Sequence, residues 1–306
     1  MGKDILDPAV LARISNLTLR ARTVVEGVLS GLHRSPHHGS SVEFVEHKEY
    51  SPGDELKHVD WKVLGRSDKY YVKQFEEETN LKCHLILDTS GSMGYASGDV
   101  SKFEYARTLA ASLAYLMLKQ GDSVGIVTFA DRTVQHVPPR SKSSHLQAVV
   151  ELLEKAAPAG KTGLANTLGE LAERMRRRSL LIVLSDLFDT TDRVLGSLKQ
   201  FRHRRHELIL FHILDTAEIE FPFNRLTLFR SMEDSRRVLS DAARIGQRYR
   251  DEVAAFIERY RSECLSDQID YQLINTAQPL DQALARYLAA REKLLWEAYP
   301  SSTRSS

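Results

Sequence analysis

The sequence predicts an α/β protein built on a doubly wound, mostly parallel sheet. From residue 82 onward, short apolar runs alternate with segments of helical periodicity. The runs are continuous rather than alternating, which is typical of strands covered on both faces. These runs are Leu85–Leu87, Val124–Val127, Leu180–Leu184 and Leu208–Phe211. Strands and helices in alternation favour a sandwich whose ligands bind beyond the carboxyl ends of the strands.

A helix and an extended segment precede this core. Asp7 and Pro8 are an N-cap followed by a first-turn proline, and the helix that they start is expected to end at Gly31. Its apolar residues recur every three or four positions: Val10, Ile14, Leu17, Ala21, Val24 and Val28. Short extended pieces are expected at 42–45 and 70–75.

Helices are expected between the strands of the core. The first has its apolar stripe between Phe103 and Met117 and is ended by Gly121, because glycine favours the left-handed turn that follows a helix. The others cover 146–153 and 164–175.

The C-terminal part has a different pattern. Residues 226–229 and 238–239 are predicted to form a β-hairpin laid against the edge of the sheet. A long helix over 245–264, a strand over 270–274 and a closing helix over 280–295 follow.

These elements define the expected organisation of the chain. Residues 1–80 are expected to pack on the core, which spans 81–215, and residues 216–298 to extend the same sheet. The polar tail, 299–306, is expected to be disordered. There is no internal repeat and no long linker, so the added pieces decorate one core.

Composition narrows the class of protein. The 42 Lys and Arg balance 41 Asp and Glu, so the formal charge of +1 gives no global attraction to nucleic acid or anionic lipid. Cys83 and Cys264 have no metal-ligand spacing and are expected to be reduced core residues. Without an apolar run of signal-peptide or membrane-span length, we expect a cytoplasmic protein with no membrane insertion.

The segment Asp88-Thr-Ser-Gly-Ser92 carries the chemistry that spacing alone indicates. It follows a buried strand and presents a carboxylate and two hydroxyls, Ser90 and Ser92, around one point. Oxygen ligands of this kind suit a hard divalent cation, most plausibly Mg2+, with Mn2+ and Ca2+ as alternatives. Thr162, in a turn, and Asp186, at the end of another strand, are the candidates to complete the set. Both Asp88 and Asp186 sit at strand ends, so the fold would bring them to one rim of the sheet.

These three segments together resemble the metal-ion-dependent adhesion site of von Willebrand factor A domains. Upstream, Tyr50-Ser-Pro-Gly-Asp54, Asp60-Trp61, Arg66 and the acidic Phe75-Glu-Glu-Glu78 are similar to a bacterial family, domain of unknown function 58. The resemblance covers roughly residues 25 to 290. Members of this family are commonly encoded beside MoxR-type AAA+ ATPases, which implies such an ATPase as partner.

The resemblance also implies a role for each site residue. Ser90 and Ser92 would bind the metal directly, while Asp88 and Asp186 would do so directly or through waters. Thr162 would bind in one of two conformational states. The sixth ligand would be a carboxylate of a partner protein. The implied function is a non-enzymatic, Mg2+-dependent interaction module, an adaptor or co-chaperone of an AAA+ ATPase.

One residue departs from the family pattern. The turn before the threonine usually offers two glycines, and Lys161 stands at the second. A cation there would either weaken metal binding or bind the partner's acidic group. We therefore assign Lys161 to the partner-binding residues with Asp54, Asp60, Trp61 and Arg66. The segment from Tyr50 to Trp61 is equally compatible with a structural loop.

Simpler interpretations stay open for single residues. Asp186 and Thr162 would each serve naturally as a helix N-cap. Two basic clusters, 174–178 and 202–206, lie at predicted helix ends, where they offset the helix dipole. A scaffold with an unoccupied metal site, or a hydrolase using the same metal, are the competing functions. For the hydrolase, His84 is the nearest base in sequence, about 13 Å along the strand from Asp88.

Overall fold

The computed structural model describes residues 16–34, 47–49, 71–73, 82–175, 177–285 and 287–288. Contacts divide the chain into two compact units. Residues up to 29 and from 81 onward form one unit, and residues 30–80 form the other.

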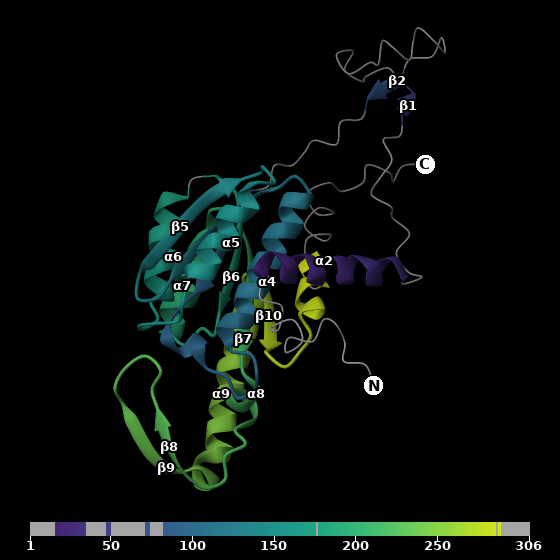
Figure 1. Cartoon of the computed structure of the whole chain (residues 1–306). Coiled ribbons are helices and arrows are strands. Elements are labelled where there is room, and N and C mark those ends of the chain that lie inside the picture. The colour runs from purple at the N-terminus through teal and green to yellow at the C-terminus, as the bar shows by residue number, and fades with distance from the viewer. Residues whose placement is uncertain are drawn as a thin grey trace, which may run out of the picture. The chain divides into compact units, whose positions relative to one another are not determined.

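A six-stranded sheet forms the centre of the larger unit, in the order β10-β7-β6-β3-β4-β5 (Figure 1). All neighbouring strands are parallel except β4 and β5. The strands are β3 Lys82–Asp88, β4 Ser123–Phe129, β5 Thr133–Arg140, β6 Leu180–Ser185, β7 Glu207–Leu214 and β10 Asp270–Asn275. The predicted fold class and all four predicted core strands are confirmed.

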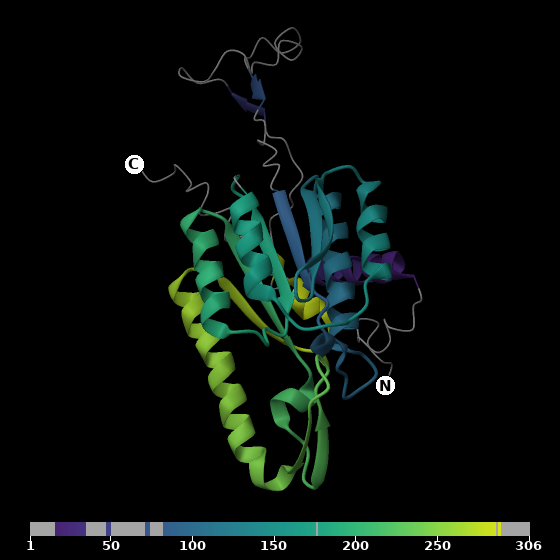
Figure 2. The ribbon, with the colours of Figure 1, turned by 90° about the vertical axis from the view of Figure 1, so that its left-hand side faces the viewer.

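Helices cover both faces of this sheet (Figure 2). On one side α4, Lys102–Lys119, contacts β3, β4, β6 and β7, and α5, His145–Lys155, contacts α4 and β5. On the other side lie α6 Leu164–Arg174, α7 Thr191–His203 and α9 Ala242–Ser266. The core between the sheet and these three helices includes Phe129, Phe201 and Tyr260, all fully buried. Burial of this apolar surface is the main force that holds the two layers together.

The N-terminal helix continues beyond its predicted end. Helix α2 spans Leu17–Arg34, and the Asn16 side chain accepts a hydrogen bond from Leu19 N at 3.0 Å. This cap precedes the first residue of α2, Leu17, and the helix continues through Gly31. Its predicted apolar residues Leu17, Ala21, Val24 and Val28 are buried. Residues 7–15 lie outside the described part of the chain.

In the smaller unit, β1, His47–Glu49, pairs with β2, Tyr71–Lys73, in antiparallel fashion. Strand β2 confirms the extended piece predicted at 70–75. The piece predicted at 42–45 lies outside the described residues.

Strand β5 was missed by sequence analysis. It contains Pro138 and Pro139, and most of its residues are exposed or half-buried. Proline has no amide hydrogen to donate, so it is tolerated on an edge strand, and β5 is an edge of the sheet. Because β5 is little buried, its sequence lacks the continuous apolar run by which the other strands were predicted.

The predicted C-terminal hairpin exists, but its predicted position is wrong. Strands β8, Leu226–Arg230, and β9, Arg237–Asp241, pair only with each other. The hairpin is held near its turn, where the Phe229 ring stacks on Phe221 at 5.7 Å between centroids. It therefore projects below the strand ends instead of extending the sheet (Figure 1).

The remaining C-terminal elements follow the sequence more closely. Helix α9 and strand β10 confirm the predicted helix and strand. A short helix, α8 Thr216–Glu220, was missed; Asp215 and Glu218 form a capping box that starts it. The closing helix is described over 280–285 and 287–288, with Leu280 and Leu284 buried. No helix in the described ranges is both long and apolar enough to cross a membrane.

Candidate functional site

The predicted ligands lie where the chain changes direction in the sheet. Strands β3 and β6 are neighbours, but β4 and β5 follow β3 on one side, whereas β7 and β10 follow β6 on the other. Asp88 is the last residue of β3, and Asp186 directly follows β6. Parallel sheets bind ligands at such switch points. The fold thus brings two residues far apart in sequence to one rim.

A hydrogen-bond network fixes the first segment. Asp88 accepts from Ser90 N at 2.8 Å through one carboxylate oxygen and from Ser185 Oγ at 2.6 Å through the other. The Ser90 and Ser92 hydroxyl oxygens lie 3.1 Å apart. Asp88 and Ser90 are fully buried. The network therefore holds a carboxylate and two hydroxyls in one place before any ligand arrives.

The turn that carries Thr162 packs against this segment. Gly91 N donates to Gly160 O, and Ala159 N donates to Thr89 O, both at 2.9 Å. The buried Oγ1 of Thr162 has no hydrogen-bond partner. Helix α6 begins after Gly163 without a side-chain cap, so Thr162 does not serve as the cap.

Asp186 is also free of a capping role. Its Oδ1 accepts from Phe188 N at 3.2 Å, and helix α7 begins later, with Thr190 at its N-cap. The other oxygen, Oδ2, accepts from Lys102 Nζ at 2.8 Å. Asp186 is fully buried, so this contact is an ion pair shielded from water.

Lys102 is a residue of the site that sequence analysis missed. Its ammonium lies 2.6 Å from Glu218 Oε1 as well, and 4.9 Å from the centre of the Phe188 ring. Burial alone would lower the pKa of Lys102, but Asp186 and Glu218 raise it above its usual value. Lys102 directly precedes Phe103, the first residue of the apolar stripe predicted for α4. This position at the start of a buried helix was the only hint in the sequence that Lys102 is buried.

The two site carboxylates repel each other. Burial and then the charge of Asp186 raise the pKa of Asp88 to about 7, against a partial offset from its hydrogen bonds to Ser185 and Ser90. A cation between them would relieve both costs. Lys102 already supplies a positive charge at Asp186, so the uncompensated carboxylate of the pair is Asp88.

The donor set fits a hard divalent metal. Two oxygens at the site are buried without a hydrogen-bond partner, Thr162 Oγ1 and Glu233 Oε1. In the described part of the chain, no group of three or more His, Cys, Asp and Glu side chains is placed to hold a metal. Three of the five expected ligands are hydroxyls, and mixed carboxylate and hydroxyl sets with retained waters suit Mg2+.

Glu233 was also missed. It lies at the tip of the β8–β9 hairpin, and Thr162 N donates to its Oε2 at 3.4 Å. Burial, with the charge of Asp186, raises the pKa of the Glu233 carboxyl, and hydrogen bonds from Thr162 N and Ser92 partly offset this. Glu233 lies in a turn far along the chain from β3 and β6, so the sequence gives no indication of its contact with Thr162.

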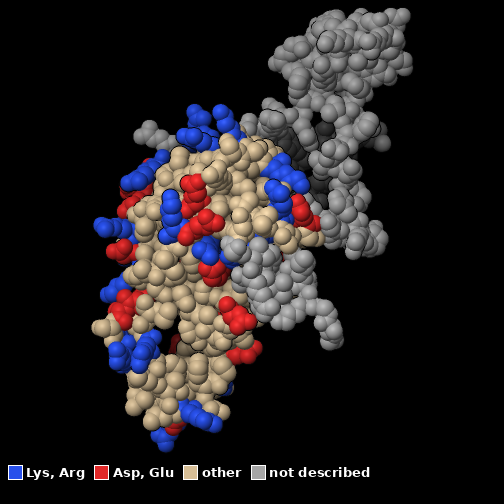
Figure 3. Space-filling model, viewed as in Figure 1, with Lys and Arg blue, Asp and Glu red and all other residues tan. Residues whose placement is uncertain are grey.

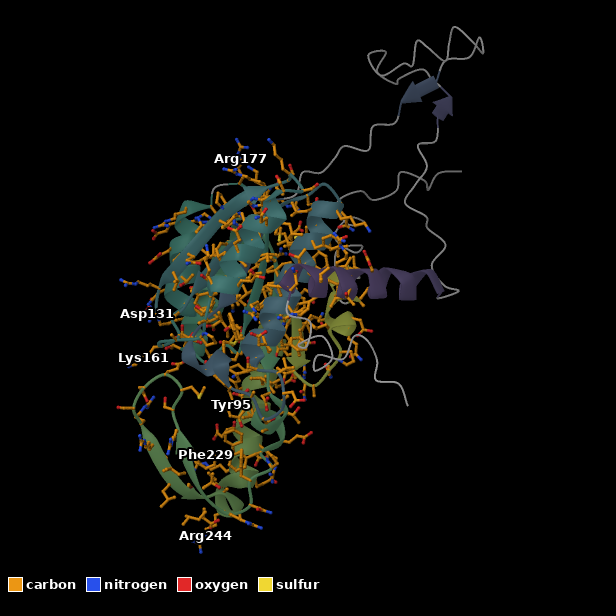
Figure 4. All side chains as sticks on the ribbon, viewed as in Figure 1. Tyr95, Asp131, Lys161, Arg177, Phe229 and Arg244 are labelled. Carbon is orange, nitrogen blue, oxygen red and sulfur yellow. The ribbon has the colours of Figure 1, made fainter. Side chains whose placement is uncertain are left out.

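Lys161 does not reach into the carboxylate pair. It is exposed and lines a shallow surface hollow with Asp131, Arg132 and Gly160 (Figure 4). The other predicted partner-binding residues, Asp54, Asp60, Trp61 and Arg66, lie outside the described residues.

The basic clusters have local roles. Arg202 donates to the backbone oxygens of Asp267 and His206 at 3.1 and 2.9 Å, and Arg178 pairs with Glu207. Helices α6 and α7 end at Arg174 and His203, as expected for cations at helix C-termini. Acidic and basic side chains are interspersed on the face shown in Figure 3.

His84, the candidate base for a hydrolase, is a weak base and lies too far from the site. Burial, followed by His136, His206 and Lys82, lowers its pKa to about 4. It lies in β3, four residues before Asp88, about 13 Å away along an extended strand. A general base must lie within hydrogen-bond distance of the proton that it removes, and His84 does not.

This lowered pKa predicts an acid-labile fold. The folded state binds a proton at His84 less readily than the unfolded chain, whose histidine has a pKa near 6.5. The stabilisation is complete above pH 6.5 and is lost as the pH falls toward 4. The slope is at most about 1.4 kcal/mol per pH unit. Urea unfolding across this range should show a weaker pH dependence for His84→Asn than for the wild type.

The exposed His203 supplies the control. His203→Asn should retain the wild-type pH dependence. Identical slopes for the two variants would contradict a buried neutral His84.

Comparisons with known proteins identify a family and several similar chains. The family model described as "Protein of unknown function DUF58" matches residues 46–261. The "Uncharacterized protein Rv1480" of Mycobacterium tuberculosis is 28% identical over 227 residues, 72% of this chain and 69% of that protein. Two solved structures are also similar. BatB from Bacteroides thetaiotaomicron is 14% identical over 70% of this chain and 99% of that chain, with a TM-score of 0.47. The VWA domain of SpRpn10 is 13% identical over 67% and 93%, with a TM-score of 0.39. Since the family model spans well over half of its length, the chain belongs to the DUF58 family.

Proposed function

We propose that this chain is a Mg2+-dependent protein-interaction module that recognises a carboxylate of its partner. The observation that carries the proposal is the convergence of three segments on one rim. Asp88, Ser90, Ser92, Thr162 and Asp186 lie on segments joined by direct hydrogen bonds. One of these potential ligands, the Thr162 hydroxyl, is buried with no hydrogen-bond partner.

The residues divide the work of holding the ion. The hydroxyls of Ser90 and Ser92 would bind it directly, and the carboxylates of Asp88 and Asp186 directly or through water. Lys102 holds Asp186 in place through its buried ion pair, but its charge also limits how strongly Asp186 attracts the ion. A bound Mg2+ would act as a Lewis acid that attracts an anionic oxygen from a partner.

The resemblance to DUF58 proteins supplies the candidate partner, a MoxR-type AAA+ ATPase. The chain would then act as adaptor or co-chaperone, delivering clients or regulating the ATPase. Because such an ATPase consumes ATP, we place the interaction in the cytoplasm. Lys161, exposed on the rim beside the site, is suited to bind a second acidic group of the partner.

A hydrolase is the weaker alternative. Within the described residues, the histidine nearest to Asp186 in the sheet is His212, paired with Ser185 in the strand register. Burial lowers the pKa of His212 to about 3, which makes it a poor base. A scaffold with an empty site remains the other alternative, and metal titration separates it from the proposal.

Mg2+ should stabilise the fold. At one hundred times the dissociation constant, the gain is about 2.7 kcal/mol, a rise in melting temperature of several degrees. Ser92→Ala, which removes a direct ligand, should abolish most of this rise. Ser144→Ala, an exposed serine without a cap bond, is the matched control and should keep it. Equal melting with and without Mg2+ in the wild type would refute metal binding.

Partner binding should depend on the metal. Affinity for a purified MoxR-type ATPase, measured by titration, is expected to fall at least tenfold on adding EDTA and to recover with excess Mg2+. Ser92→Ala should weaken binding similarly. If the wild type binds Mg2+ but the ATPase binds equally with and without EDTA, the metal is structural and the proposed recognition is wrong.

A further inference from the structure

The tip of the β8–β9 hairpin closes over the candidate metal site. A Cβ added to Gly91 would lie 2.1 Å from Met232 O, so the hairpin backbone rests directly on the ligand-bearing turn. From the next residue, Glu233, the carboxylate accepts from Thr162 N at 3.4 Å. Both views of the fold show the tip beside the turn that follows β3 (Figures 1 and 2).

The Glu233 carboxylate is incompletely satisfied in this position. Its Oε1 is buried and has no hydrogen-bond partner, and the same is true of Thr162 Oγ1. Leaving a buried polar atom unpaired costs about 1–3 kcal/mol. An ion between these two oxygens would satisfy both, so the arrangement suits a site whose carboxylate ligand is already present.

The hairpin is not part of the central sheet. Its outer face exposes Leu226, Leu228 and Leu239, with 69%, 46% and 63% of each residue accessible. Its strands pair only with each other, and an isolated two-stranded hairpin is marginally stable. Displacing the tip would therefore disrupt few contacts of the core.

We propose that Glu233 is an internal carboxylate ligand of the metal and that a partner's carboxylate binds by displacing it. This inference rests on the proposed Mg2+ site and names the group that regulates it. The position expected for a partner is then held by the chain itself until the hairpin tip leaves.

An internal ligand competes strongly. A group tethered by a short segment has an effective concentration on the order of millimolar. A lone carboxylate at lower concentration does not displace it. The site thereby selects partners that make further contacts, and it stays closed to free small acids.

Glu233→Gln tests the inference by chemical rescue. This variant keeps the shape of the side chain and removes its charge. We expect its Mg2+ affinity, measured by calorimetry, to fall about tenfold or more. Sodium acetate, added above the millimolar range expected of the internal ligand, should restore much of that affinity. Sodium chloride at the same ionic strength should not, and acetate should leave the wild type unchanged.

Asp131→Asn is the matched control. Asp131 is an exposed carboxylate on the same rim, beside Lys161, so this variant loses the same charge without losing the ligand (Figure 4). Its Mg2+ affinity should stay within about twofold of the wild type, because exposed charges are screened.

The outcomes separate the two proposals. If the wild type binds no Mg2+, the proposed function fails and the role of Glu233 fails with it. If the wild type binds Mg2+ and Glu233→Gln binds it equally well with no effect of acetate, the metal site stands and the internal ligand is refuted. A loss of affinity without acetate rescue also refutes the displacement, since the vacated position would not accept a carboxylate.

Discussion

Lys102→Met is expected to destabilise the metal-free fold by about 3–5 kcal/mol, the usual cost of removing one partner of a buried ion pair. The ammonium of Lys102 contacts Asp186 and Glu218 and is itself fully buried. Methionine fills most of the space of the stem but leaves two acidic groups without their cation. Mg2+ should recover part of the loss, because it takes over the compensation of Asp186, and the variant should bind Mg2+ more tightly than the wild type.

Lys199→Met provides a like-for-like control. Lys199 also pairs with two acids, Glu263 at 2.9 Å and Asp267 at 3.3 Å, but its side chain is 39% exposed. Surface pairs contribute about 0–1 kcal/mol. Urea unfolding of both variants, each with and without Mg2+, measures the four free energies of unfolding to be compared with the wild type. A cost for Lys102→Met no larger than that of Lys199→Met would contradict the central role of the buried pair.

The parallel core was predictable because both of its faces are covered. Strands such as β6 then consist of apolar residues only, and the pattern needs no knowledge of neighbours. Edge elements lack this signal. Strand β5 is half exposed and carries two prolines, so nothing in its composition separates it from a loop.

The candidate site was predictable only in part, for a related reason. Asp88, Ser90, Ser92, Thr162 and Asp186 were recognised as a spaced set. Their convergence on one rim follows from the order of the strands. The spacing of these five residues does not predict which side chains of other elements contact them.

The groups that face the ligands come from other elements. Lys102 reaches Asp186 across 84 positions, and Glu233 reaches Thr162 across 71. Such contacts depend on helix rotation and on the direction of a hairpin, which local periodicity does not encode. The hairpin itself was predicted, but its placement on the sheet edge was wrong. Nothing in its sequence indicates which strand of the sheet it would pair with.

The site also depends on a close approach that only glycine permits. A Cβ on Gly163 would lie 2.3 Å from Asp131 O, in the turn between β4 and β5. Gly163→Ala must push that turn away from the segment carrying Thr162. We expect a loss of about 1–3 kcal/mol in stability, the usual cost of overpacking. Mg2+ affinity should fall at least tenfold, because the adjacent Thr162 loses its position.

Gly169→Ala makes the same chemical change six positions later with the opposite expected sign. Gly169 lies within helix α6, and a Cβ there would meet nothing within 4 Å. Alanine should stabilise the helix by about 0.5–1 kcal/mol and leave Mg2+ affinity unchanged. Urea unfolding and Mg2+ titration of both variants decide the matter. If Gly163→Ala were tolerated like Gly169→Ala, the contact between the two turns would not position Thr162.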